Sequence, residues 1–273
     1  MNKRLNSWVV AAACMAPFSP AAIAAPDWSN VPKTDIFLFH PGATPLEWLT
    51  DKSGKHGGYT GLKKNMTCTD CHIEEGKLNI NLQRLASKDG LEPVGAPKVL
   101  SFPVTVQAAH DESNLYMRLT FKAPVGSFHK ADKVNEVKAT VMFANDKVAK
   151  GKIFGCWAGC HLDAKTMSVS QGAFDLMQWR SGEGGKVADG IVAEKASMDE
   201  GKSGVTAEAS KAGDTYTVTF TRKLAGGVEM VPGKSTPIGI SIHADHSGGR
   251  FHHVSLEHRL GIGIKGDVSA VKQ

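Results

Sequence analysis

The sequence predicts a mainly β protein, an antiparallel β-sandwich preceded by a small irregular and helical segment. From about residue 98, short runs of alternating apolar and polar residues recur, rich in β-branched side chains and bounded by Gly, Asp, Asn, Ser or Pro. In one run, Tyr216, Val218 and Phe220 share a face. Helical patterns between the strands, which a parallel βαβ protein requires, are missing. The predicted strands are 99–107, 115–122, 137–143, 190–196, 205–209, 215–221, 238–243 and 251–260.

The N-terminus predicts a secretory signal peptide over residues 1–24. A basic start and a short apolar run interrupted by prolines lead to Ala22-Ile23-Ala24, a small-x-small cleavage site. The apolar run is shorter than the roughly 20 residues of a membrane span. We therefore expect a periplasmic protein that does not span the membrane. A lipoprotein modification at Cys14 is the alternative interpretation.

The mature chain divides into two parts by composition. Residues 25–95 are rich in Gly, Pro, Lys and Asp and poor in aliphatic side chains, so they cannot build a convincing core alone. We expect an irregular monohaem segment in which the haem serves as much of the core. Residues 96–273 carry the predicted strands and form the sandwich. The interval 146–188 is interpreted as a haem-bearing insertion, with 176–180 returning to the sheet.

The clearest motif is Cys68-Thr69-Asp70-Cys71-His72, the C-x-x-C-H signature of covalent c-type haem attachment. Cys68 and Cys71 would each form a thioether with a haem vinyl group, and His72 would bind the iron from one side. A zinc site would need a second ligand pair at matching spacing, and a redox dithiol would need a thioredoxin-like setting. The sequence offers neither.

A second, looser motif places one more residue between its cysteines, Cys156 and Cys160, and continues directly with His161. It predicts a second covalent haem with His161 as an iron ligand, and a disulfide between the two thiols is the alternative. Once the signal peptide is removed, all four remaining cysteines lie in the two motifs. An exported protein would normally use spare cysteines in disulfides. Two c-type haems are therefore predicted.

The charge of the chain argues against nucleic acid as a partner. The formal net charge is +5, and the signal peptide carries two bases and no acid, which leaves +3 for the mature chain. The propionates of two haems would cancel most of this charge. No dense basic run with interleaved aromatic residues is present.

Each iron needs a ligand opposite the histidine of its motif. For the first haem, His40 and His56 lie upstream in a Gly-containing region that could fold over the haem. Met66 is too close to Cys68 to reach the far face. We favour bis-histidine ligation, with His56 ahead of His40.

For the second haem, the segment 243–253 holds four histidines in eleven positions. His252 shares a strand face with Val254 and Leu256, so His252 is predicted to point inward and His253 outward. We expect His252 to be the ligand. A histidine–methionine pair would raise the potential relative to bis-histidine ligation. The reserve ligands are His243, His246, His253 and Met167.

Several stretches resemble the haem-binding domain of the ethylbenzene dehydrogenase type, which also occurs as the cytochrome subunit of related molybdenum enzymes. The stretches are 102–111, 115–119, 179–180 and 249–255. The resemblance covers roughly residues 90–270 and implies a β-sandwich that holds a non-covalent b-type haem between a methionine and a lysine. The part from Phe37 to His72 looks like a monohaem segment joined to such domains in periplasmic cytochromes.

This chain departs from that family at both expected ligands. Cys156, Cys160 and His161 lie near the place of the family's methionine, and histidines fill the glycine-rich segment where its lysine is expected. The departure implies a covalent haem in the equivalent pocket, with His161 opposite one of the late histidines. The family's partner enzyme is therefore not carried over to this chain.

Two six-coordinate haems predict electron relay in place of catalysis, because neither iron would have an open site. We expect a dihaem cytochrome c that passes electrons between a membrane quinol-oxidising system and a periplasmic oxidoreductase. The alternative is a haem enzyme, a peroxidase or a small-oxide reductase, with an open site at the second haem and acid–base groups from Asp245, Arg250 and His253. A haem-based sensor ranks last, since no signalling domain accompanies the haem motifs.

Overall fold

A computed structural model describes residues 25–41, 49, 52, 56–83, 98–124, 136–145, 147–148, 173–182, 184–192, 196–199, 204–244 and 252–273. The helices within these ranges are α2 (Tyr59–Lys63) and α3 (Cys68–His72). The strands are β1 (Thr34–Phe39), β2 (Ile73–Glu74), β3 (Lys77–Leu78), β4 (Ser101–His110), β5 (Asn114–Lys122), β6 (Lys138–Ala144), β7 (Phe174–Arg180), β8 (Lys186–Val192), β9 (Ala196–Met198), β10 (Thr206–Ala212), β11 (Thr215–Lys223), β12 (Ser235–His243), β13 (His252–Val254), β14 (His258–Ile262) and β15 (Val268–Lys272).

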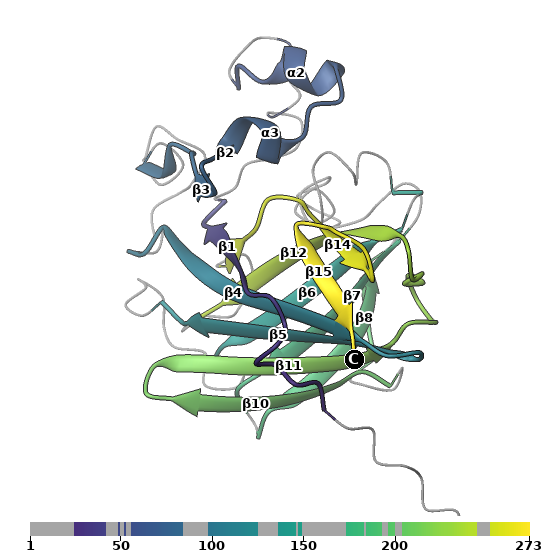
Figure 1. Cartoon of the computed structure of the whole chain (residues 1–273). Coiled ribbons are helices and arrows are strands. Elements are labelled where there is room, and N and C mark those ends of the chain that lie inside the picture. Colours follow the sequence, from purple (N-terminus) through teal and green to yellow (C-terminus); the bar gives the residue numbers. More distant parts are fainter. Residues whose placement is uncertain are drawn as a thin grey trace, which may run out of the picture.

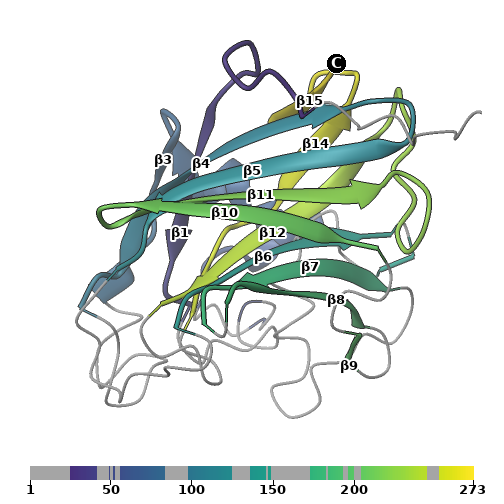
Figure 2. The same ribbon diagram turned by 90° about the horizontal axis from the view of Figure 1, so that it is seen from below.

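The large sheet follows the order β10-β11-β5-β4-β1-β13-β12-β6-β7-β8-β9. Figure 2 shows this path folding over into two facing layers, with β4, β5, β11 and β10 opposite β12, β6, β7 and β8. Two pairs of strands join the layers along the same edges of β4 and β12. β1 pairs with β4 at 101–106 and β13 pairs with β12 at 241–243, while β15 pairs with β4 at 108–110 and β14 pairs with β12 at 235–238. The mainly β architecture predicted from the sequence is confirmed.

The main core lies between the two layers and is built from alternating side chains. Leu119 and Val218 of one layer and Val141, Met177 and Ile240 of the other belong to one buried apolar cluster. Strand β11 alternates half-buried and buried positions, as its sequence predicts. Alternation of this kind directs every second side chain to the same face, so both layers present an apolar inner surface.

Every predicted strand run overlaps a strand of the sheet, and residues 176–180 return to it as part of β7. Two runs were predicted as continuous and are broken: 190–196 spans the end of β8 and the start of β9, and 251–260 is divided into β13 and β14. The division into domains at residue 96 stays a prediction.

Strand β1 corrects the expectation that residues 25–97 are irregular and at most helical. It pairs with β4 from Thr34 to Phe39 and with β13 at Phe39. Ile36 and Leu38 are 1% and 0% exposed. A six-residue strand surrounded by Gly, Pro and Lys gives little periodicity, and its pairing with β4 makes it a strand of the large sheet.

Strand β15 departs from the predicted antiparallel arrangement, because it runs parallel to both β14 and β4. The five residues between β14 and β15 fold back along β14. The close approach requires glycine: a Cβ added at Gly261 would overlap the carbonyl oxygen of Ile264 and lie 2.9 Å from the backbone nitrogen of Gly266.

A bulge separates β13 from β14 opposite β12. Val254 pairs with Ser241 and His258 pairs with Ile238, so three residues on one strand face two on the other. Ser255 stabilises the break: its backbone N–H donates to the Ile240 carbonyl at 2.9 Å and its hydroxyl accepts the Ile240 N–H at 3.0 Å. The extra residue changes the direction of the side chains that follow, Glu257 among them.

The segment that carries the first haem motif lies at one end of the sheet, beside the end of β1 (Figure 1). It consists of α2, α3 and the small β2–β3 hairpin. In the described ranges of the chain, no helix has the length and hydropathy to cross a membrane.

We predict that Gly261→Ala lowers the free energy of unfolding by about 1–3 kcal/mol, the range for overpacking, because the new Cβ has no room against the 264–266 backbone. Chemical denaturation of the purified protein measures this loss. The control is Gly213→Ala, where φ is +62° and a Cβ meets nothing within 4 Å, so only backbone strain is added. A Gly261→Ala loss no larger than that of the control would contradict the packing explanation.

Candidate haem site

The first haem motif forms one capped turn of helix. Thr67 is the N-cap of α3: its hydroxyl accepts the Asp70 N–H at 3.2 Å, and the Asp70 carboxylate accepts the Thr67 N–H at 2.8 Å. This reciprocal capping box satisfies two backbone donors and fixes where the helix begins. Residues three and four apart lie on the same helix face, so Cys68, Cys71 and His72 are brought together locally.

A tight hairpin orients the His72 ring. Glu75 (φ 49°) and Gly76 (φ 75°) form the turn between β2 and β3, and both take the positive φ that a type I′ hairpin needs. The turn returns Asn79 to His72, where the Asn79 carbonyl oxygen lies 2.9 Å from His72 Nδ1. A carbonyl only accepts, so Nδ1 carries the proton and Nε2 is the nitrogen suited to a metal.

His56 lies opposite this ring. The centres of the His56 and His72 rings are 6.0 Å apart, and the ring planes differ by 31°. His56 Nδ1 donates to the Leu49 carbonyl at 3.0 Å, which selects the same tautomer as in His72. Two imidazoles that bind one metal atom from opposite sides, at about 2 Å per nitrogen, have ring centres roughly 6 Å apart. The pair therefore fits a single iron between them.

Glycine makes room for the His56 ring. A Cβ at Gly58 would lie 2.7 Å from His56 Cε1, closer than side chains normally approach. Gly57, the residue between them, has a φ of +43°. The Lys-His-Gly-Gly sequence thus permits a sharp return of the chain beside the ring.

An apolar cluster surrounds Cys68 and combines the haem segment with the end of the sheet. Its fully buried members come from β1, from Leu49 and from the β13 region, and are Phe39, Leu49, Val254 and Leu256. Its partly buried members come from the haem segment and are Leu62, Cys68, Ile73, Leu78, Ile80 and Leu82. Half-covered apolar side chains next to the attachment cysteines are suited to the face of a porphyrin.

Glu257 joins the haem-bearing turn to the sheet. Its Oε1 accepts the Thr69 N–H at 2.8 Å and the Thr69 hydroxyl at 2.6 Å. Glu257 is only 5% exposed, and burial raises its pKa while the bonds from Thr69 act in the opposite direction. Burial, and then the neighbouring Glu257 carboxyl, raises the pKa of the Cys68 thiol. Strand alternation did not predict Glu257, because its side chain is placed by the bulge.

His40, the other predicted ligand for the first haem, lies within the end of the sandwich. It follows β1 and is 2% exposed, and its ring centre is 6.0 Å from that of His253. Burial lowers the pKa of His40. The structure thus brings His56 beside His72 and His40 beside His253.

The predicted orientations of His252 and His253 were wrong. His253 is 4% exposed, packs edge-on against Phe102 at 5.0 Å, and donates from Nε2 to the Val99 carbonyl at 2.7 Å. Burial lowers its pKa to about 4. His252 is half-buried and stacks on His243 with ring centres 4.8 Å apart.

His253 is buried and His252 only half-buried because the sheet is covered on both faces at β13. His252 does share a face with Val254 and Leu256, as predicted, but that face packs on the haem segment and not on the sandwich core. The opposite face, which holds His253, packs on the core at Phe102.

Several predicted features lie outside the described residues. They are the signal peptide 1–24, the second motif with Cys156, Cys160 and His161, the reserve ligands His246 and Met167, and the acid–base candidates Asp245 and Arg250.

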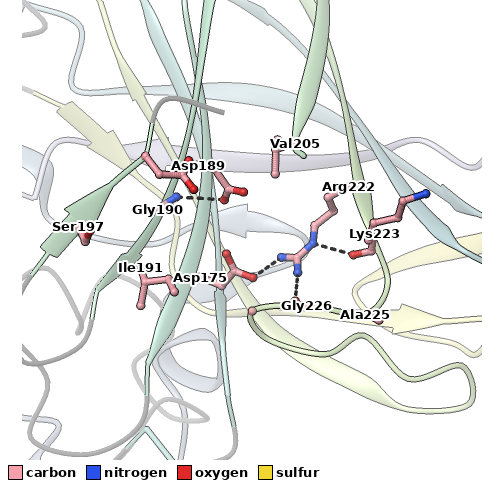
Figure 3. A pocket seen from close by; sticks show the side chains of 12 residues that line it. Asp175, Asp189, Gly190, Ile191, Ser197, Val205, Arg222, Lys223, Ala225 and Gly226 are labelled. Carbon is pink, nitrogen blue, oxygen red and sulfur yellow. Dashed lines mark hydrogen bonds and ion pairs between the residues drawn. The ribbon is translucent and has the colours of Figure 1, made fainter. Parts of the chain in front are cut away.

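A cavity of about 170 Å³ lies away from the haem segment, between β7, β8 and the turn after β11 (Figure 3). Its centre is the buried ion pair of Arg222 Nη1 with Asp175 Oδ2 at 2.6 Å. Arg222 also donates to the carbonyls of Lys223, Gly226 and Val228. These bonds use its donors within the protein, so we interpret the pair as a structural connection between β7 and the turn at 224–228.

No protein-family model matches the chain. A solved carbohydrate-binding module of family 9 from Caldicellulosiruptor kristjanssonii, in complex with glucose, covers 56% of this chain and 65% of its own at 9% identity and a TM-score of 0.34, too low to bear on fold or function.

Two curated relatives are much more similar. Cytochrome c-552 of Stutzerimonas stutzeri is 42% identical over an alignment of 295 positions, which covers 100% of both chains. Cytochrome c-551 of Rhodocyclus tenuis is 41% identical over 259 residues, which cover 91% of this chain and 100% of that protein. With identity of this level over the full length, and with a capped C-x-x-C-H turn facing an apolar cluster, the chain belongs to this family of c-type cytochromes, electron-transfer proteins with covalently bound haem.

Proposed function

We propose that this chain is an exported dihaem cytochrome c that relays electrons between a membrane quinol-oxidising system and a periplasmic oxidoreductase. The observation that carries the proposal is the facing pair of His56 and His72, 6.0 Å between ring centres. With a histidine on each side, an iron held between these rings would have no open position for a substrate. Electron transfer without bond chemistry is the activity that such a site favours.

At the first haem, Cys68 and Cys71 would form the thioethers, and His72 and His56 would bind the iron. Bound haem supplies a ferric–ferrous couple. The chain's own contribution is orientation: the Asn79 and Leu49 carbonyls hold the two rings through Nδ1. The apolar side chains around Cys68 exclude water from the haem face.

At the second haem, Cys156 and Cys160 would form the thioethers, and His161 and His252 would bind the iron. The cysteine count supports this assignment, because no thiol of the mature chain lies outside the two motifs. His253 is the weaker candidate, since its Nε2 already donates to Val99. The sandwich that carries these residues is in keeping with a domain of the ethylbenzene dehydrogenase type, altered here for covalent haem.

The haem number is predicted to be two. Mass spectrometry of the protein exported by a host that matures cytochromes c should give the mass of residues 25–273 plus two haem groups. A double substitution of Cys156 and Cys160 by Ala should remove one haem, and the same change at Cys68 and Cys71 should remove the other. A single haem in the unmodified protein would contradict the dihaem assignment and make the second thiol pair a disulfide or free thiols.

The ligand opposite His72 is predicted to be His56. In His56→Ala, the first haem should lose its low-spin spectrum and bind carbon monoxide rapidly when reduced, because one axial position becomes open. His40→Ala is the matched control and should stay low-spin, since His40 packs against His253. The opposite pattern would assign the position to His40. Rapid carbon monoxide binding by the unmodified protein would favour the haem-enzyme alternative.

A further inference from the structure

Glu257 is an ionisable group that the ligation scheme does not use. The bulge between β13 and β14 places it against the first turn of α3, where Thr69 donates both its N–H and its hydroxyl to Oε1. The second carboxyl oxygen, Oε2, is buried and has no hydrogen-bond partner among the described residues. A carboxyl with one satisfied and one unsatisfied oxygen can exist as the anion or as the acid.

The carboxyl lies beside Cys68, close enough to raise the pKa of that thiol. Since Cys68 carries one of the covalent bonds to haem in a c-type cytochrome, Glu257 adjoins the point where the haem edge is attached. A charge in a low-dielectric environment interacts with a nearby redox centre far more strongly than a charge in water.

The charged groups near Glu257 are occupied elsewhere. On its own strand, His258 donates to the Leu256 carbonyl and Arg259 binds Ser235. On α3, the Asp70 carboxylate caps the helix at Thr67. The ion pairs between described residues do not include Glu257. Among the residues that the structure describes, no permanent cation therefore fixes Glu257 in the charged form.

We propose that Glu257 takes up one proton when the haem at Cys68 is reduced and releases it on oxidation. A one-electron donor protein supplies the electron that converts ferric to ferrous iron, and the solvent supplies the proton that converts the carboxylate to the acid. The two charges cancel, so the haem pocket keeps its net charge.

Because of this coupling, the reduction potential of the first haem should fall as the pH rises. The anionic carboxylate favours ferric iron, so the potential is low where Glu257 is ionised. The neutral acid removes that preference, so the potential is higher at low pH. Burial raises the pKa of Glu257. The sloping region, meaning the pH range over which the reduction potential changes with pH, therefore moves from the usual range of an exposed glutamate towards neutral pH. Within this pH range the reduction potential of the first haem falls by up to about 59 mV per pH unit, because one proton is taken up for each electron.

The test is a spectroscopic redox titration of the haem-loaded protein at a series of pH values. Glu257→Gln keeps an oxygen that accepts the bonds of Thr69 and removes the titration. The variant should hold the first haem at the higher, low-pH potential and lose the slope due to this group. Glu74→Gln is the control: Glu74 follows His72 closely in sequence but is exposed, so solvent screens its charge and the slope should persist.

Thr69→Val provides a second test that retains the carboxyl. Loss of the hydroxyl donor removes one bond that stabilises the anion, so the sloping region should move to higher pH. Mass spectrometry of each variant verifies the haem at Cys68, which separates failure of this inference from failure of the proposed function. A haem-loaded Glu257→Gln with the slope and potential of the unmodified protein would overturn the proposal, as would an unmodified protein whose first-haem potential is independent of pH between 5 and 9.

Discussion

The half-covered apolar cluster around Cys68 is the constraint on which the haem segment depends. The segment has too few aliphatic side chains to fold around itself, and its members in the cluster are only partly buried. Phe39 and Val254, paired across β1 and β13, supply a fully buried surface from the sheet. Full burial of a large apolar side chain stabilises a protein by about 1.5–3 kcal/mol. Covalent haem would therefore stabilise the segment by covering apolar side chains that the protein itself buries only in part.

Polar contacts at this end of the molecule act mainly to orient rings. His72, His56 and His253 each donate one ring N–H to a backbone carbonyl, of Asn79, Leu49 and Val99 respectively. Such bonds select a tautomer and limit ring rotation. For His72 and His56 they leave Nε2 as the metal-binding nitrogen. For His253 they use Nε2 itself, which connects β13 to the chain before β4.

Burial also shifts the pKa of three ionisable groups where the sheet meets the haem segment. Burial lowers the pKa of His40 and His253, so both stay neutral imidazoles at neutral pH beside the sandwich end. Glu257 is the buried acid on the other face of the same strand region, and hydrogen bonds from Thr69 to an anionic acceptor are worth about 1.5–3 kcal/mol each. Only Glu257, among these three groups, combines burial with strong donors and an unsatisfied oxygen, which is why it responds to a change of charge nearby.

The sequence by itself determined the local chemistry. The spacing of Cys68, Cys71 and His72 is a helix-face pattern, and Thr67 and Asp70 form the cap within the same six residues, so no distant contact is needed to assemble the attachment turn. Alternation likewise predicted most strands, because side-chain direction has a period of two. Only the tertiary structure decided which face of β13 meets the core, that β1 belongs to the large sheet, and that Glu257 reaches Thr69 across 188 residues of sequence. Those features depend on strand register and on one extra residue in a bulge, and a long-range pairing leaves no periodic mark on the sequence that it connects.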